Sequence, residues 1–146
     1  MKVARVKNGI VGLGLVCDSH IKAYLSNPNA EVIAVCDLDR ARAKAVADEF
    51  GIKEYYASYD EMLRNDEINT IDITTPTVLH APMSIAAARA GKNILCEKPF
   101  CLTLEEGRAV CKDAERNGVT LMVGESYIFM TSIVKGATAH RCRRNR

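Results

Sequence analysis

The chain has 146 residues, of which 48% are hydrophobic and 26% charged, values that suit one soluble globular domain with a buried core. Its apolar runs fall short of the roughly 18 residues that span a bilayer, and its N-terminus lacks the pattern of a signal peptide, so we expect a cytoplasmic protein. The net charge of +2 comes from four arginines in the last six residues; the rest is slightly acidic, which argues against nucleic acid as a partner.

The first half of the chain alternates between apolar, strand-like runs and segments with a helical pattern. The helical segments stop at turn signals such as Asn27-Pro28-Asn29 and Gly51. A continuous apolar run is typical of a strand covered on both faces. The expected strands are 5–11 and 31–36, and the expected helices are 16–25, 39–50 and 59–64.

The same alternation continues in the second half. We expect strands at 70–74, 93–96 and 120–124, and helices at 78–90 and from about 103 to 117. Thr103 and Glu106 form a capping box at the start of the last helix. Residues 127–130 are apolar, 131–135 could begin another helix, and 136–146 show no periodic apolar face. This pattern predicts an α/β fold, a doubly wound parallel sheet, over 1–135 and an irregular basic tail over 136–146.

The six cysteines show neither a C-x-x-C pair nor histidines at the spacing of a zinc site. Several stand in apolar, strand-like runs, where a free cysteine behaves as a small hydrophobic residue. We therefore expect reduced thiols and no metal. The cysteines are Cys17, Cys36, Cys96, Cys101, Cys111 and Cys142.

A glycine-rich turn follows the first expected strand. Gly12 permits a tight turn, and Gly14 allows the backbone to approach a pyrophosphate, which the next helix meets with its N-terminus. The third glycine position of this fingerprint is occupied by Cys17, so the match is imperfect. Taken alone, the motif is more typical of a structural glycine turn than of a cofactor site.

Asp37 follows the second expected strand, 23 residues after Gly14, close to the spacing of a ribose-binding carboxylate. Such a carboxylate accepts hydrogen bonds from the ribose hydroxyls and repels a 2′-phosphate, which favours NAD over NADP. The alternative role is that of a helix N-cap. Because Asp39 can serve as the cap, Asp37 remains available for a cofactor.

Two further strand ends carry unusual residues. Thr74-Thr75-Pro76 and Glu97-Lys98-Pro99 each follow a strand, and His80 lies one turn into the next helix. Ligands of open parallel sheets bind outside the carboxyl ends of the strands, so both tripeptides should line one crevice. The alternative for Glu97 and Lys98 is a solvated ion pair.

Taken together, the motifs resemble the Gfo/Idh/MocA oxidoreductase family, the group of glucose–fructose oxidoreductase and inositol dehydrogenase. The resemblance extends from about Val3 to about Lys135, and its most distinctive part is the E-K-P tripeptide. The motifs are G-L-G-x-x-x-x-x-H ending at His20, V-C-D ending at Asp37, I-T-T-P-x-x-x-H ending at His80, and A-G-K-N-I-L-C-E-K-P ending at Pro99.

The resemblance implies a role for each matching residue. The pyrophosphate would be held by Gly12, Gly14, Leu15 and Val16, and the adenosine ribose by Asp37. The cofactor groove would be lined by Thr74, Thr75, Pro76 and His80. The nicotinamide ribose would lie beside Glu97 and Lys98. Lys98 would also reach the substrate hydroxyl as the catalytic residue, and Pro99 would follow a cis peptide bond. A nicotinamide contact is expected near Glu125 and Ser126, whereas His20 is expected to pack its helix against the sheet.

Members of this family carry a second domain with the substrate pocket and an acid–base residue, and nothing in this sequence matches it. We therefore expect a truncated chain that binds NAD and turns over little substrate, a sugar, inositol or similar polyol. Without that second domain to cover them, we expect Ile128, Phe129 and Ile133 to be exposed and to drive self-association. A non-catalytic dinucleotide sensor is the alternative function. A third candidate function is that of a methyltransferase with a similar glycine turn, but the E-K-P tripeptide gives no reason to expect one.

Overall fold

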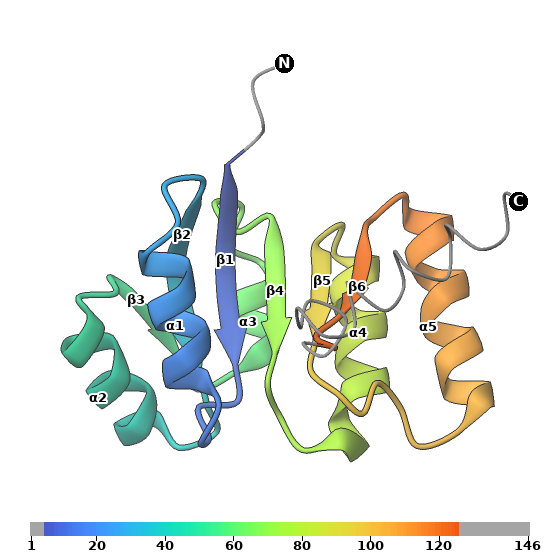
Figure 1. Ribbon diagram of the computed structural model, residues 1–146, viewed down its shortest axis with the longest axis horizontal. Helices are drawn as coiled ribbons and strands as arrows, with labels where there is room; N and C mark the ends of the chain where they lie inside the picture. Colours follow the sequence, from blue (N-terminus) through green and yellow to red (C-terminus); the bar gives the residue numbers. More distant parts are fainter. Residues whose placement is uncertain (1–4, 126–146) are drawn as a thin grey trace, which may run out of the picture.

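The computed structural model describes residues 5–125, and the predicted alternation of strands and helices is present in it (Figure 1). The strands are β1 (Val6–Val11), β2 (Ala30–Cys36), β3 (Glu54–Tyr56), β4 (Thr70–Ile73), β5 (Asn93–Cys96) and β6 (Leu121–Val123). The helices are α1 (Cys17–Leu25), α2 (Arg40–Phe50), α3 (Tyr59–Leu63), α4 (His80–Arg89), α5 (Leu104–Asn117) and a 3-10 turn, η1 (Thr77–Leu79).

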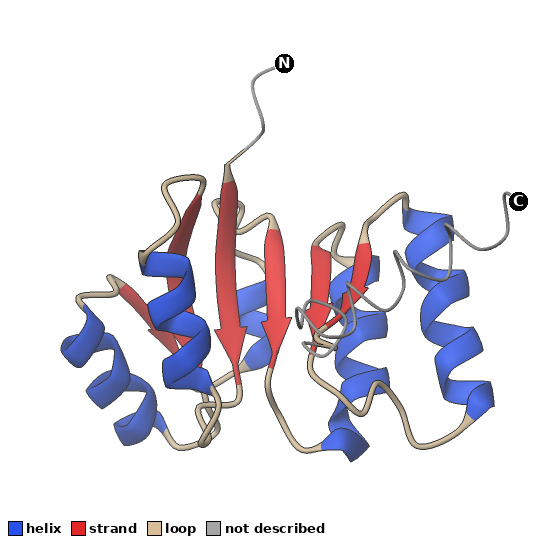
Figure 2. Ribbon diagram, viewed as in Figure 1, coloured by secondary structure: helices blue, strands red, loops and turns tan. Residues whose placement is uncertain are grey.

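The strands form one sheet in the order β3-β2-β1-β4-β5-β6, and every neighbouring pair is parallel (Figure 2). The chain runs from β1 outward to β3 and then crosses back to β4 on the other side of β1. The strand order therefore reverses between β1 and β4, and such a switch point opens a crevice at the carboxyl ends of the strands. This confirms the predicted doubly wound parallel fold.

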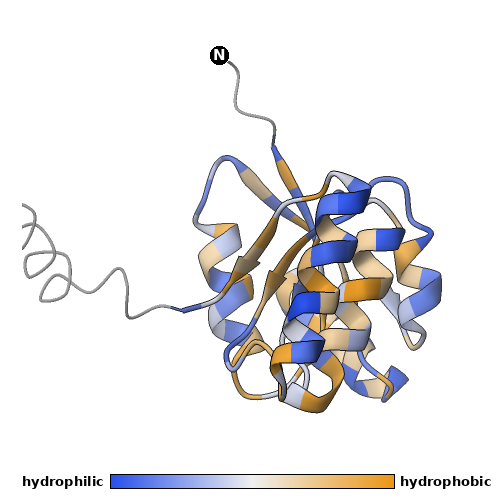
Figure 3. Cartoon of the chain, turned by 90° about the vertical axis from the view of Figure 1, so that its right-hand side faces the viewer, coloured by the Kyte–Doolittle hydropathy of each residue, from blue (hydrophilic) through white to orange (hydrophobic). Residues whose placement is uncertain are grey.

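Two hydrophobic clusters hold the helices on opposite faces of the sheet. One joins α1 and α2 to β1 and β2 through residues such as Ile21, Ala47 and Val35. The other joins α3 and α4 to the central strands through residues such as Met62, Ala87 and Ile71. Figure 3 shows hydrophobic stretches along the strands and helices that alternate between hydrophobic and hydrophilic residues, as expected for helices with one buried stripe.

The helix ends follow from local chemistry. The Asp39 side chain accepts hydrogen bonds from the backbone N–H groups of Ala41 and Arg42, which caps α2 as the sequence predicts. Helix α2 ends at Gly51 and α5 at Gly118, both in the left-handed conformation that glycine adopts without strain.

The capping box at α5 differs in detail from the expected pattern. Thr103 accepts from the backbone N–H of Glu106, but the Glu106 carboxylate reaches back to the N–H of Leu102 instead of Thr103. The sequence analysis also missed β3, a strand of three residues that is too short for a periodic signal. In the predicted helix at 78–90, the α-helix begins at His80, after the 3-10 turn.

The cysteines among residues 5–125 are free thiols. Burial raises the pKa of the Cys36 and Cys96 thiols to about 12, so both stay protonated at neutral pH. No helix within 5–125 has the length and hydropathy to cross a membrane. Predictions for Ser126, for the apolar segment 127–135 and for the basic tail lie outside the described residues.

Replacing Asp39 with alanine removes two backbone hydrogen bonds at the N-terminus of α2, so we expect a loss of about 1 kcal/mol in the free energy of unfolding. Urea denaturation of the purified chain measures it. Asp39→Asn is the matched control, because asparagine caps as well as aspartate. An equal loss in both variants would show that the charge, and not the cap, stabilises the helix.

Candidate functional site

The turn between β1 and α1 passes very close to the loop that follows β4. Gly12 has a φ of +91°, and a Cβ atom placed there would lie 2.7 Å from the backbone nitrogen of Thr75. The N–H of Gly12 donates to the carbonyl of Cys36 at the end of β2. Only glycine combines this φ with this approach, so the first glycine of the motif is required by the fold itself.

Gly14 has the opposite environment. A Cβ atom added there would meet no protein atom within 4 Å, so no packing contact requires a glycine here. The turn borders a surface cavity of about 480 Å³ lined by Leu13, Gly14, Leu15, Asp18 and Arg42. Space beside Gly14 that no side chain fills is what a closely approaching ligand needs.

Helix α1 begins at this turn with no side chain capping it. The N-cap residue Val16 makes no side-chain hydrogen bond, and Cys17 is the first helical residue. Leu15, although apolar, is fully exposed. Backbone N–H groups at such a helix start can bind a phosphate. Asp18 in the first turn of α1 brings one negative charge close to that position.

Asp37 follows β2, and its carboxylate is tied to the glycine turn. One oxygen accepts from the backbone N–H of Leu13 at 3.0 Å, and the other accepts from the N–H of Asp39 at 2.9 Å. The guanidinium of Arg42 lies 3.7 Å from the first oxygen. Asp37 therefore fixes the turn in addition to the ribose-binding role predicted from its spacing.

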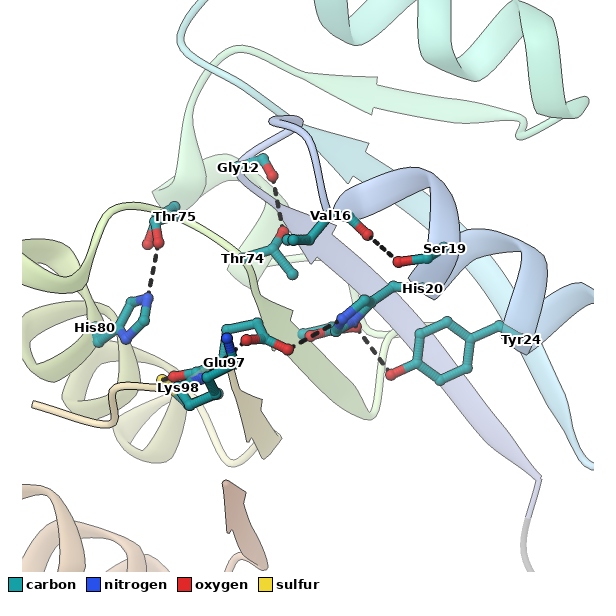
Figure 4. Close-up of polar contacts among 12 residues, drawn as sticks. Gly12, Val16, Ser19, His20, Tyr24, Thr74, Thr75, His80, Glu97 and Lys98 are labelled. Atoms are coloured by element: carbon teal, nitrogen blue, oxygen red, sulfur yellow. Dashed lines mark hydrogen bonds and ion pairs between the residues drawn. The ribbon is translucent and has the colours of Figure 1, made fainter. Parts of the chain in front are cut away.

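The loop after β4 is joined to the same turn. The hydroxyl of Thr74 lies within hydrogen-bond distance of the carbonyls of Val11 (3.0 Å) and Gly12 (2.7 Å), and Thr74 is buried (Figure 4). Thr75 contacts Gly12 as described above, and Pro76 is exposed. Thr74 therefore joins the ends of β1 and β4 through buried hydrogen bonds. Thr75 and Pro76 form the edge of the crevice.

His80 lies at the start of α4 and is buried below this edge. Its ring is buried, with 1% exposure, and its two nitrogens lie 2.8 Å from the carbonyl of Pro99 and 2.7 Å from that of Thr75. The expectation that His80 lines the groove needs correction, because packing at the start of α4 turns the ring into the protein. The residue instead joins the loop after β4 to the loop after β5.

The E-K-P tripeptide follows β5. The backbone N–H of Glu97 donates to Ile73 of β4, and a Glu97 carboxylate oxygen accepts from the N–H of Lys98 at 3.0 Å. Lys98 is exposed, and its bond to Pro99 is cis, as the resemblance implied. At Gly124, after β6, a Cβ atom would lie 3.1 Å from a Glu97 oxygen, so the Glu97 side chain is confined between two strand ends.

Glu97 also contacts helix α1. The His20 ring lies 3.2 Å from a Glu97 oxygen and 2.8 Å from an oxygen of Asp72, a fully buried residue of β4. The hydroxyl of Tyr24 donates to the same Asp72 oxygen at 3.0 Å. His20 thus lies between helix and sheet, as expected. The carboxylates that surround it raise its pKa above 6.5, chiefly through the hydrogen bond to Asp72, and burial opposes this only in part.

The predicted site residues within 5–125 all lie at the carboxyl edge of the sheet, after β1, β2, β4 and β5, while Ser126 lies outside the described residues. Sequence reasoning missed three participants: Arg42, Asp72 and Tyr24. Arg42 has a signal in hindsight, because it stands five residues after Asp37. Asp72 has a weaker one, since a carboxylate inside an apolar strand needs a partner.

This edge has the parts that a dinucleotide requires: an open glycine turn at a helix start, a carboxylate at the end of β2, and a partly buried glutamate with an exposed lysine after β5. Among residues 5–125, no three histidine, cysteine, aspartate or glutamate side chains gather in an arrangement that could hold a metal ion.

The comparisons with known proteins agree with this geometry. The sequence model of the oxidoreductase family with an NAD-binding Rossmann fold, Gfo/Idh/MocA, matches residues 6–125. D-apiose dehydrogenase of Paraburkholderia graminis is 36% identical over 131 residues, which are 90% of this chain and 35% of that protein. D-xylose 1-dehydrogenase (NADP(+)) 2 of Haloferax volcanii is 41% identical over 122 residues, 83% of this chain and 37% of the relative. The chain thus spans little more than a third of these curated relatives.

Among solved structures, scyllo-inositol dehydrogenase from Lactobacillus casei with bound NAD(H) and scyllo-inositol is similar, with a TM-score of 0.81 and 25% identity over 88% of this chain and 38% of that one. The fold, the motifs and the family match agree. The chain belongs to the Gfo/Idh/MocA oxidoreductase family, as its NAD-binding Rossmann domain.

Proposed function

We propose that this domain binds NAD along the carboxyl edge of its sheet and serves an enzyme that transfers hydride between the nicotinamide and a hydroxyl-bearing carbon of a sugar, inositol or similar polyol. One observation carries the proposal. The glycine turn, Asp37 and the Glu97-Lys98 pair are far apart in sequence but follow β1, β2 and β5, and therefore lie along one edge of the parallel sheet. They lie in the order in which a dinucleotide presents ribose, phosphates and nicotinamide.

The phosphate end of the site rests on backbone groups. We assign the pyrophosphate to Gly14, Leu15 and Val16, because no side chain fills the space beside Gly14 and the N-terminus of α1 has no side-chain cap. Gly12 keeps this turn against Thr75, and Asp37 holds it from the side of β2.

The choice between NAD and NADP rests on two opposite charges. Asp37 would accept from the ribose hydroxyls and repel a 2′-phosphate, whereas an arginine nearby can accommodate that phosphate. Arg42 lies 3.7 Å from Asp37, on the same side of the turn. The carboxylate of Asp37 is held by two backbone N–H groups, so it stays in place to exclude NADP, and NAD is our assignment.

At the other end, Lys98 is the catalytic residue of the proposal. When bound, the nicotinamide accepts or donates the hydride. The exposed Lys98 ammonium would donate a hydrogen bond to the reacting hydroxyl, and Glu97 would accept from the nicotinamide ribose. We assign the base that takes the hydroxyl proton, like the substrate pocket, to the part of the relatives' length that this chain does not match.

Gly14→Ala should weaken NAD binding roughly tenfold, because the new methyl group occupies the space where the phosphates approach. The stability of the ligand-free chain should not change, since no protein atom lies within 4 Å of that methyl group. Calorimetric titration with NAD and thermal unfolding separate the two effects. Gly12→Ala is the contrasting variant, and it should cost about 2 kcal/mol of stability. A Gly14→Ala variant that binds NAD normally would contradict the placement of the phosphates.

Asp37→Asn should raise the ratio of NADP to NAD affinity roughly tenfold, because it removes the charge that repels a 2′-phosphate and leaves Arg42 without its partner. The ratio is the informative quantity, since loosening of the turn at Leu13 would weaken both cofactors alike. Arg42→Ala is the matched control and should shift the ratio the other way. An unchanged ratio in both variants would place the adenosine ribose elsewhere.

The purified 146-residue chain should bind NAD but form little or no NADH with a panel of sugars and inositols, because the proposal places the proton-accepting base outside it. Absorbance at the NADH band measures turnover. In a polypeptide of the relatives' full length, Lys98→Ala should lower kcat roughly a hundredfold or more. Robust turnover by the 146-residue chain would show that the edge described here is catalytically complete.

A further inference from the structure

His20 lies between two carboxylates that come from different parts of the sheet. Its Nδ1 is 2.8 Å from Asp72 Oδ2, within β4, and its Nε2 is 3.2 Å from Glu97 Oε1, after β5 (Figure 4). The His20 side chain is 18% exposed, that of Glu97 is 16% exposed, and that of Asp72 is fully buried. The three groups form a compact cluster on the α1 side of the sheet.

The partners of His20 decide its charge. Ionised carboxylates only accept hydrogen bonds, and a neutral imidazole has one donor nitrogen. Both contacts are therefore satisfied only when the ring carries two protons. Tyr24 donates to the same Asp72 oxygen, and Glu125, after the next strand, lines the same cavity as His20 and Glu97. The neighbouring carboxylates raise the pKa of His20, which agrees with the geometry.

The same contact determines how Glu97 is held. Its Oε1 faces His20, its Oε2 accepts from the backbone N–H of Lys98, and a Cβ atom at Gly124 would lie 3.1 Å from Oε1. If the ring loses its second proton, one of the two carboxylates loses its hydrogen bond from the ring. Glu97 has the more exposed side chain of the two, so it is the one that can turn towards solvent.

We propose that His20 is a positioning residue, whose imidazolium holds Glu97 between α1 and the E-K-P loop, so that the proton on His20 sets the geometry of the loop that carries Lys98. The inference rests on the proposed function only where it predicts cofactor affinity. Tyr24 holds Asp72 in place within β4. A change in the protonation of His20, on α1, is therefore passed to Glu97 and to the proposed nicotinamide end of the site.

The direction of the pH effect follows from linkage. Since folding raises the pKa of His20 above its ordinary value of 6.5, the contribution of the cluster to stability is complete below pH 6.5 and is lost as the pH rises through the higher, folded value. Glu97 is released over the same interval, so NAD affinity should fall as the solution becomes more alkaline.

The first test needs no cofactor. NMR follows the His20 ring, assigned with His20→Asn, together with the backbone amide of Lys98 during a pH titration of the 146-residue chain. We expect His20 to titrate above its ordinary value and the Lys98 amide to shift with the same midpoint. In His20→Asn, and in Glu97→Gln, the Lys98 amide should lose this midpoint. The inference would be overturned if the chemical shift of the Lys98 amide in the wild-type chain did not change as His20 titrates.

The second test measures NAD affinity by calorimetry from below pH 6.5 to alkaline pH. The NAD affinity of the wild-type chain should fall roughly fivefold across the His20 titration. The NAD affinity of His20→Asn should be low and independent of pH. Lys22→Asn is the matched control, an exposed position on the same helix, and it should behave as wild type. Wild-type affinity that does not change with pH would contradict the inference. Absence of NAD binding at every pH would instead contradict the proposed function, and the NMR titration would still decide whether His20 positions the loop.

Discussion

The close approach of the β1–α1 turn to the loop after β4 is the constraint on which the rest of this domain depends. At Gly12 there is no room for a Cβ atom against the backbone of Thr75, and the Thr74 hydroxyl reaches the carbonyls that end β1. These contacts lie where the strand order reverses. They bring the start of α1 against the crevice and so place an uncapped helix N-terminus where an anion can reach it.

Several residues of the edge hold the scaffold and, in the proposed function, the ligand as well. Asp37 secures the glycine turn through Leu13 while its carboxylate lies at the end of β2, and Glu97 is held by its own loop and by His20. His80 is wholly internal, yet it joins the two loops that border the nicotinamide end. A substitution at any of these positions therefore changes geometry and affinity together, which is why ratios and pH profiles are more informative than binding constants alone.

The charge arrangement differs between the two ends of the crevice. At the end proposed for the adenosine, a carboxylate held by backbone N–H groups lies near an arginine. At the end proposed for the nicotinamide, two carboxylates share one histidine close to an exposed lysine. A partly buried cluster with one titratable ring responds to pH over a range in which carboxylates and lysines do not. Sensitivity to pH is therefore concentrated at the end where the proposed chemistry takes place.

The layered parallel fold could be predicted from the amino-acid sequence, because hydrophobic periodicity and turn residues are local signals that alternate along the chain. The sequence also located the glycine turn, Asp37 and the E-K-P tripeptide, because each follows a recognisable strand. The tertiary structure alone decided which side chains meet across strands. The burial of His80 and the Asp72–His20–Glu97 cluster depend on register, twist and helix placement, which join residues far apart in the chain and leave no periodic trace in the sequence. The three-residue strand β3 escaped prediction for a related reason, since pairing with β2, and not its own pattern, makes it a strand.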